Sequence, residues 1–236
     1  MICNNLSPIP RLYLLTITKG GIMYHKLRND SELPAEKDNQ KKVGFAIELF
    51  DYNIEKILYN FHQVFLYGAI DEKMTPCICE ELVAMDAMNQ LEYGENYDKY
   101  IPITLRIWSP GGYVTGGLAI IDTMTTLKTP IITMVTGQAA SMASIITLTG
   151  DVRLATKNSD IMFHPMRGGV DYDYLPYEKD QMAHTERSNK RVLDITCQRT
   201  KLGQKRYKKI LDKAENGELW LNAEEAKLYG VIDDII

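Results

Sequence analysis

Short apolar segments alternate with segments of helical periodicity along most of the chain beyond residue 60. The apolar segments are rich in β-branched and aromatic residues and end at glycine, proline or polar turns, which predicts buried strands. They lie at 62–68, 101–108 and 130–135. Apolar positions recur at helical spacing in 73–90, 115–127 and 142–149. Alternating strands and helices predict βαβ units and a largely parallel sheet, so we expect an α/β fold.

The pattern continues in the second half of the chain, where a long polar helix is its most unusual part. Two further strands are predicted at 152–156 and 161–165, and the segment 168–174 is expected to form an exposed extension. The helix predicted at 177–200 has few apolar positions. Because such a helix seldom packs well on its own domain, we expect a partner subunit to cover it. The last predicted elements are a short apolar segment at 219–221 and a helix at 223–229.

The first 42 residues do not follow this pattern. Residues 26–42 are dense in charged residues, asparagine, serine and proline, a composition that favours a flexible leader over a packed element. The apolar run at 12–15 is too short for a convincing signal peptide, and Met23 is an alternative start. We therefore expect a flexible leader at 1–42 and one domain at 43–236.

Composition narrows the possible functions. A chain of 236 residues with 45% hydrophobic residues can bury a good core, and a net charge of −4 with scattered basic residues gives no nucleic-acid footprint. No apolar run approaches the length of a membrane span, so no membrane partner is expected. Cys77 and Cys79 have no second cysteine or histidine pair at a matching distance, so we expect no metal site. All four cysteines are interpreted as free thiols of a reducing compartment.

One serine stands where a predicted strand gives way to a helix. Ser141 lies in the segment 136–144, with the sequence Thr-Gly-Gln-Ala-Ala-Ser-Met-Ala-Ser. A serine at a helix N-terminus lies among unpaired N–H groups and the positive end of the helix dipole, which suits chemistry that develops negative charge on a substrate oxygen. Most such turns are only helix starts. A second turn, Ser-Pro-Gly-Gly at 109–112, would lie at the same edge of a parallel sheet, so we expect the two turns to face one another.

Several motifs in order along the chain resemble the ClpP family, the peptidases of the ATP-dependent Clp protease. They are Phe65-Leu66-Tyr67-Gly68, Ser109-Pro110-Gly111-Gly112, Gly137-Gln138-Ala139-Ala140-Ser141-Met142, Asn158-Ser159, Met162-Phe163-His164, Glu225-Ala226, Tyr229-Gly230 and Ile232-Asp233. The resemblance extends from about Asn60 to Ile236. It implies the ClpP and crotonase-like fold of repeated ββα units, with a protruding handle of a strand and a helix at about 168–200.

The resemblance implies a role for particular residues. Ser141 would be the catalytic nucleophile, and His164 would accept its proton and later protonate the leaving amine, a task that suits histidine near neutral pH. The backbone N–H groups of Gly112 and Met142 would hold the oxyanion, which requires a tight approach of the backbone. The same resemblance places the bound peptide strand near Gly111 and Tyr113.

The acidic member of the triad is where the chain departs from the family pattern. The family usually has aspartate two residues before an aromatic residue; here the aromatic residue is Trp220 and Glu218 precedes it. A glutamate can orient an imidazole as an aspartate does if the backbone retreats to fit the longer side chain. Asp212 is the fallback. Other departures are Trp108, where asparagine is common, and Ala143, where glycine is common.

The resemblance also implies partners. It suggests that unfolded polypeptides or peptides are the substrates and that two rings of seven subunits stack through the handle to enclose the active sites. The chain has no Gly-x-x-x-x-Gly-Lys motif, so ATP would be used only by a separate AAA+ unfoldase of the ClpX, ClpA or ClpC type. We expect no cofactor in this chain. The expected location is the bacterial cytoplasm, or the host cytoplasm for a viral protein, with an organellar stroma as the alternative.

Three other interpretations stay open at the level of sequence. Glu218 in place of aspartate is compatible with a weakly active or inactive ring subunit that serves assembly. The divergent N-terminal part and the Glu-x-Trp arrangement are compatible with a viral head-maturation protease of the same fold. A crotonase-type acyl-CoA enzyme would have no need for a serine and a histidine in these two motifs.

Overall fold

The computed structural model divides the chain into two units, Met1–Ile57 and Leu58–Ile236. The residues that the structure describes are 13–18 and 21–26 in the first unit, and 61–165, 175–204, 207, 209 and 217–236 in the second. The predicted extension at 168–174 and most of the predicted leader therefore lie outside the described residues.

The first unit contains a strand pair that the sequence analysis did not predict. Strands β1 (Tyr13–Thr18) and β2 (Gly21–Lys26) are antiparallel, with Tyr13 opposite Lys26. Both strands fall within the predicted leader. Two residues separate them in sequence, a spacing typical of a hairpin, and tyrosine, isoleucine and threonine supply the strand propensity.

The second unit is built on a seven-stranded sheet. Its strands are β3 (Gln63–Tyr67), β4 (Ile103–Ser109), β5 (Ile131–Ala140), β6 (Val152–Ala155), β7 (Asp160–Phe163), β8 (Leu219–Asn222) and β9 (Asp234–Ile235). The main path runs β3-β4-β5-β6-β9, and β7 pairs with both β5 and β8. Every pairing is parallel except that of β7 with β8, which confirms the prediction of a largely parallel sheet.

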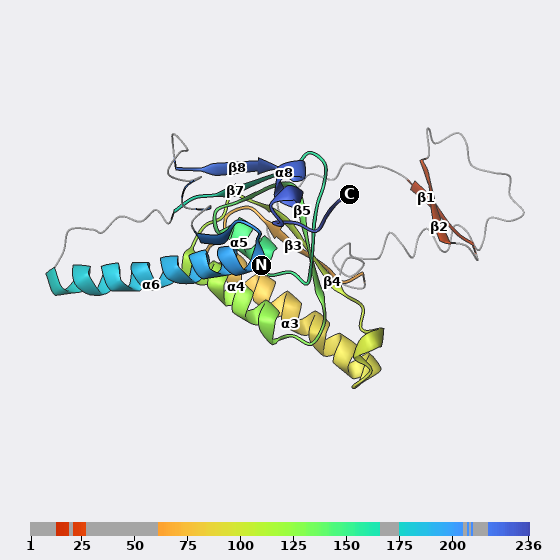
Figure 1. Cartoon of the computed structure of the whole chain (residues 1–236). Helices are drawn as coiled ribbons and strands as arrows, with labels where there is room; N and C mark the ends of the chain where they lie inside the picture. Colours follow the sequence, from red (N-terminus) through yellow and green to blue (C-terminus); the bar gives the residue numbers. More distant parts are fainter. Residues whose placement is uncertain are drawn as a thin grey trace, which may run out of the picture. The chain divides into compact units, whose positions relative to one another are not determined.

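Helices connect the strands much as the sequence predicts. They are α3 (Met74–Tyr93), the 3₁₀ helix η1 (Tyr97–Lys99), α4 (Val114–Thr126), α5 (Met142–Leu148), α6 (Leu175–Arg199) and α8 (Ala223–Leu228). In Figure 1, α3 and α4 run side by side along the sheet, and α6 extends well beyond it. Within the part of the chain that the structure describes, no helix combines the length and apolar character needed to cross a bilayer.

The core lies where these helices pack on alternate residues of the strands. Val64, Leu66, Leu105 and Ile107 are fully buried, whereas Phe65, Tyr67, Arg106 and Trp108 on the other face of the sheet are partly or largely exposed. Fully burying each such side chain contributes about 1.5–3 kcal/mol. This period-two burial is the physical basis of the strand pattern that the sequence shows.

Strand β5 is longer than predicted and changes partner along its length. Its first part pairs with β6 up to Val135, and its last part pairs with β7 from Gln138 onward. The side chain of Ser159 spans the changeover: its Oγ accepts a hydrogen bond from the N–H of Gly137 (3.1 Å) and donates one to the carbonyl of Val135 (3.0 Å). Because of this change, the carboxyl ends of β5 and β7 lie side by side.

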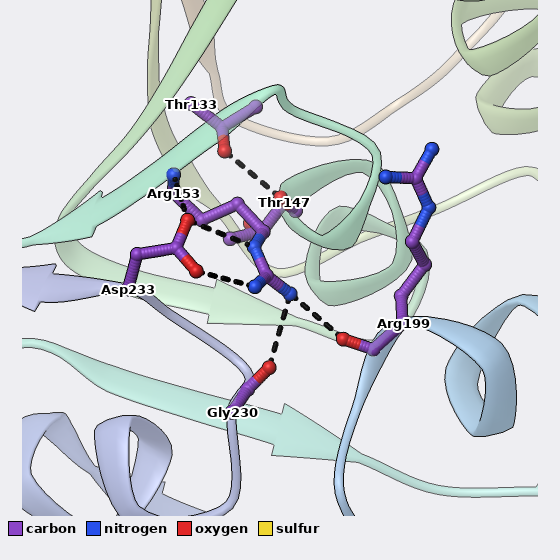
Figure 2. A network of polar contacts seen from close by, with 6 residues as sticks. All are labelled: Thr133, Thr147, Arg153, Arg199, Gly230 and Asp233. Atoms are coloured by element: carbon purple, nitrogen blue, oxygen red, sulfur yellow. Dashed lines mark hydrogen bonds and ion pairs between the residues drawn. The ribbon is translucent and has the colours of Figure 1, made fainter.

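Arg153 on β6 ties the end of α6 to the C-terminal segment of the chain (Figure 2). Its guanidinium forms an ion pair with the carboxylate of Asp233 at 2.5 Å. It also donates hydrogen bonds to the main-chain carbonyl oxygens of Arg199 and Gly230, at 2.8 and 3.0 Å. Arg199 is the last residue of α6, so its carbonyl has no partner within the helix and Arg153 supplies one.

We expect Arg153→Met to lower the free energy of unfolding by about 2 kcal/mol, because it removes charged hydrogen bonds from a side chain that is 16% exposed. Lys227→Met is the matched control. Its ion pair with Asp234 joins side chains that are 48% and 63% exposed, so its loss should cost less than about 1 kcal/mol. Urea denaturation of both variants measures the difference, and equal losses would contradict the assigned role of Arg153.

The effect of Arg153 should also depend on pH. Partial burial by itself raises the pKa of the Asp233 carboxyl, but the hydrogen bonds from Arg153 outweigh it, and the pKa lies below its ordinary value. A lowered pKa stabilises the fold fully above the unfolded-state pKa of about 3.9, and this stabilisation is lost as the pH falls through the folded-state pKa. The difference between the wild type and Arg153→Met should therefore shrink in acid.

Candidate active site

The ends of β5 and β7 bring the predicted nucleophile and base together. Ala140 at the end of β5 is paired with Met162 of β7, so Ser141 and His164 follow the ends of adjacent parallel strands. The N–H of Ser141 donates to the carbonyl oxygen of Met162 at 2.9 Å, which extends the ladder by one bond. The Nε2 atom of His164 lies 2.8 Å from Oγ of Ser141. The two side chains are thus within hydrogen-bond distance, although His164 lies 23 positions after Ser141 in the sequence.

The backbone of Ser141 is in an unusual conformation. Its φ is +56° and its ψ is −123°, and among the described residues His62 is the only other non-glycine residue with positive φ. Such a conformation costs about 1–3 kcal/mol and persists only where the surroundings hold it. Here it turns the chain sharply between β5 and α5. The turn presents the Ser141 side chain at the edge of the sheet, toward His164.

The glycine turn at 109–112 packs directly against this turn. A Cβ atom on Gly111 would lie 2.6 Å from the carbonyl oxygen of Ala140, 2.7 Å from Cβ of Ser141 and 2.9 Å from the N atom of Met142. Gly111 also has a φ of +90°. Only glycine therefore fits at this position, for both conformational and steric reasons. The expectation that the two turns face one another is confirmed.

Two backbone N–H groups at this contact have no acceptor among the residues that the structure describes. Within the residues that the structure describes, neither the N–H of Gly112 nor that of Met142 donates a hydrogen bond to the chain. Met142 is the first residue of α5, where N–H groups have no partner in the helix. The carbonyl of Gly111 and the N–H of Tyr113 are instead used in bonds to Ile70, which anchor the turn to the chain beyond β3.

The second nitrogen of the His164 ring lies against the main chain. Its Nδ1 atom is 2.5 Å from the carbonyl oxygen of Pro165. A carbonyl oxygen only accepts hydrogen bonds, so Nδ1 carries the proton and Nε2 has the free lone pair that can accept the Ser141 hydroxyl proton. Both ring nitrogens therefore have partners, and neither partner is a carboxylate.

Of the two predicted acidic residues, only Glu218 lies within the described residues. The carboxylate of Glu218 accepts a hydrogen bond from the indole N–H of Trp220 at 2.9 Å. Asp212, the fallback, lies outside the described residues. The third member of the triad stays a prediction. Tyr113, predicted to lie near the substrate strand, is 57% exposed directly after Gly112, where its side chain is open to contact.

A pocket of about 60 Å³ opens beside Ser141. Its polar side is formed by the residues of the site itself, including Ser144 and His164. Its apolar side comes from four different elements, through Val114 of α4, Ile145 of α5, Phe163 of β7 and Val192 of α6. The pocket therefore offers apolar surface directly beside the Ser141 side chain.

Sequence reasoning missed two residues of this site. Pro165 follows His164 directly, and its carbonyl is a partner that no side-chain motif could reveal. Ser144 is buried and bonds to the Ser141 carbonyl. A signal for Ser144 was present, because a serine three residues into a helix often bonds to the carbonyl three or four residues earlier.

Comparison with known proteins identifies the family. A model described as Clp protease matches residues 48–236. The chain belongs to the Clp protease family. The ClpP resemblance and the ClpP-like α/β fold predicted from the sequence are therefore confirmed. Membership of the Clp protease family implies a peptidase that acts on peptides and works in an oligomeric assembly.

Proposed function

We propose that this chain is a serine endopeptidase subunit that hydrolyses peptide bonds in unfolded polypeptides. The observation that carries the proposal is the 2.8 Å contact between Nε2 of His164 and Oγ of Ser141, at a strained strand-to-helix turn. Unpaired N–H groups beside that turn complete what acyl transfer needs: a nucleophile, a base and donors for an oxyanion.

The geometry supports a two-step reaction. Nε2 of His164 takes the hydroxyl proton as Oγ of Ser141 attacks the substrate carbonyl carbon, and the carbonyl electrons move to oxygen. The N–H groups of Gly112 and Met142 stabilise the oxyanion. When the C–N bond breaks, His164 returns the proton to the leaving amine. Water then attacks the acyl-enzyme with His164 as base again, which releases the acid and restores Ser141.

The pocket beside Ser141 supports peptides with an apolar residue at the cleaved bond. Its apolar wall at Val114, Ile145, Phe163 and Val192 offers no charged group to a side chain. Burying apolar surface there contributes to binding in proportion to the area removed from water. We propose a preference for compact apolar side chains on the acyl side of the scissile bond.

The test uses the purified full chain. A fluorogenic peptide with an apolar residue before the reporter should be hydrolysed, and a fluorophosphonate probe should label Ser141, as located by peptide mass mapping. If the assembled protein neither turns over the peptide nor is labelled, the proposed function is wrong. In that case the interpretation as an inactive ring subunit, which serves assembly only, would gain support.

We further propose that the chain forms two stacked rings of seven subunits and receives substrates from an AAA+ unfoldase in the cytoplasm. The exposed character of α6 supports the stacking: from Met182 to Lys190 its described side chains are mostly exposed, and in Figure 1 the helix extends beyond the sheet. ATP would be used only by the unfoldase. Native mass spectrometry tests the ring stoichiometry, and a monomer at working concentration would contradict it.

We expect Glu218→Gln to lower kcat/KM for a peptide by less than about tenfold, whereas loss of the carboxylate from a working triad costs about 10⁴-fold. The reason is that both ring nitrogens of His164 already have partners. In addition, a glutamine carbonyl oxygen can keep the bond from Trp220. Glu224→Gln, an exposed change on α8, is the matched control. A loss near 10⁴-fold confined to Glu218→Gln would instead assign Glu218 as the third triad member.

A further inference from the structure

The Ser141 carbonyl is held from within α5 by a buried side chain. Oγ of Ser144 donates a hydrogen bond to this carbonyl oxygen at 2.6 Å, and the N–H of Ser144 donates to the same oxygen at 3.1 Å. Ser144 is buried, with an exposed fraction of 0%. On the other side of the turn, the N–H of Ser141 is held by the carbonyl of Met162. Both backbone polar groups of Ser141, its N–H and its carbonyl, are therefore held by hydrogen bonds.

The hydrogen bonds to the Ser141 carbonyl also affect the Met142 N–H, the proposed oxyanion donor. The carbonyl of Ser141 and the N–H of Met142 belong to one peptide group, which is planar and rigid. When Ser144 holds the oxygen of that group, it also sets the direction of the N–H at the opposite end. Among the described residues that N–H has no acceptor, and it lies beside Gly111, where the substrate oxygen would be received.

We infer that Ser144 is a positioning residue: its hydroxyl fixes the Ser141–Met142 peptide plane and thereby aims the Met142 N–H at the oxyanion. This inference rests on the proposed function. Loss of an oxyanion donor typically costs about 10²–10³-fold in kcat. Without the Ser144 hydroxyl, the N–H of Ser144 still donates to the Ser141 carbonyl. The Ser141–Met142 peptide plane therefore gains some freedom but keeps one of its two hydrogen bonds. We expect Ser144→Ala to lower kcat by about tenfold, a part of that cost.

Ser144→Ala should lower kcat and leave KM nearly unchanged. An oxyanion donor acts on charge that develops only in the transition state, so misdirecting it weakens transition-state binding and spares the ground state. A peptide aldehyde, whose adduct with Ser141 carries an oxyanion, should bind about tenfold more weakly to Ser144→Ala, in line with kcat. A merely structural defect would not produce this matched change.

The matched control is Thr147, one turn further along α5. The Thr147 hydroxyl donates to the main-chain carbonyl of Ala143 at 2.9 Å and is also fully buried. Thr147→Val therefore removes the same kind of bond from α5 without touching the Ser141 peptide. Both variants are compared with the full-length wild type in kcat, KM, aldehyde affinity and thermal stability. If Ser144→Ala does not fold, Ser144→Cys replaces it, because a thiol of similar size is a weak donor.

The possible results distinguish the positioning role of Ser144 from the proposed peptidase function. A tenfold loss of kcat and of aldehyde affinity in the Ser144 variant, with Thr147→Val near the wild type, supports the inference. An active wild type with equal kcat values in both variants overturns the Ser144 role alone, and so does a change confined to KM. A wild type without turnover or fluorophosphonate labelling overturns the proposed function and, with it, the role of Ser144.

Discussion

Ser141→Ala is expected to abolish both peptide hydrolysis and fluorophosphonate labelling, with a loss of at least about 10⁴-fold in kcat. Alanine removes the hydroxyl oxygen that would form the proposed acyl-enzyme, while His164 and the N–H groups of Gly112 and Met142 stay in place. Turnover of the fluorogenic peptide and labelling of the intact protein are the measurements. Residual activity near that of the wild type would show that another residue attacks the substrate.

Ser141→Gly distinguishes the chemical role of this residue from its structural role. Serine at a φ of +56° is strained, and glycine adopts positive φ without that cost. We therefore expect the glycine variant to be as inactive as the alanine variant but about 1 kcal/mol more stable to urea than the alanine variant. Equal stability of the two variants would contradict the view that the turn stores strain.

Gly111→Ala is expected to lower kcat/KM by about 10²-fold or more, because a displacement of about 1 Å at an active site can cost that much. The added Cβ would press on the Ala140 carbonyl, on Cβ of Ser141 and on the N atom of Met142, at 2.6–2.9 Å. These are backbone atoms or the first side-chain atom, so they cannot swing aside as a long side chain could. Ser141, the proposed nucleophile, and Met142, whose N–H is a proposed oxyanion donor, must therefore shift together. Steady-state kinetics and urea denaturation are the measurements.

Gly68→Ala is the matched control for this prediction. Gly68 has nearly the same backbone conformation, with a φ of +95° against +90° for Gly111, but no atom lies within 4 Å of the position of an added Cβ. Both variants pay the conformational cost of alanine at positive φ, and only Gly111→Ala adds the collision. Equal kinetic losses would mean that strain alone, rather than the contact with Ser141, accounts for the effect.

The sequence pattern predicted the strands and helices that position the site. Residues 105–108 and 131–135 alternate buried and less buried positions because one face of the sheet packs on helices, and the observed strands β4 and β5 include most of the predicted segments 101–108 and 130–135. The turn at 109–112 and the segment around Ser141 were placed at one edge of the sheet because parallel strands share their carboxyl ends. The structure shows them in contact.

Periodicity did not predict where β5 ends or which strand it meets there. Residues 137–140 are glycine, glutamine and two alanines, which lack the β-branched side chains of a typical strand. They are nevertheless part of β5, because β7 supplies the ladder bonds from Gln138 to Ala140. A pairing between segments about 20 residues apart depends on tertiary contacts, and no local pattern reports it. The hairpin β1–β2 was not predicted, because the prediction of a flexible leader rested on the polar composition of residues 26–42.

By itself, the sequence determined the α/β class, the family motifs and the identity of the serine and histidine most suited to acyl transfer. These follow from local periodicity and from residue types at fixed spacing, which are properties of the chain alone. Only the tertiary structure decided that Ser141 and His164 meet at 2.8 Å, that the Pro165 carbonyl holds the imidazole and that Ser144 clamps the nucleophile turn. All three contacts depend on how the main chain is oriented. Strand pairing and backbone torsion angles set that orientation, and the types of side chain along the sequence do not reveal it.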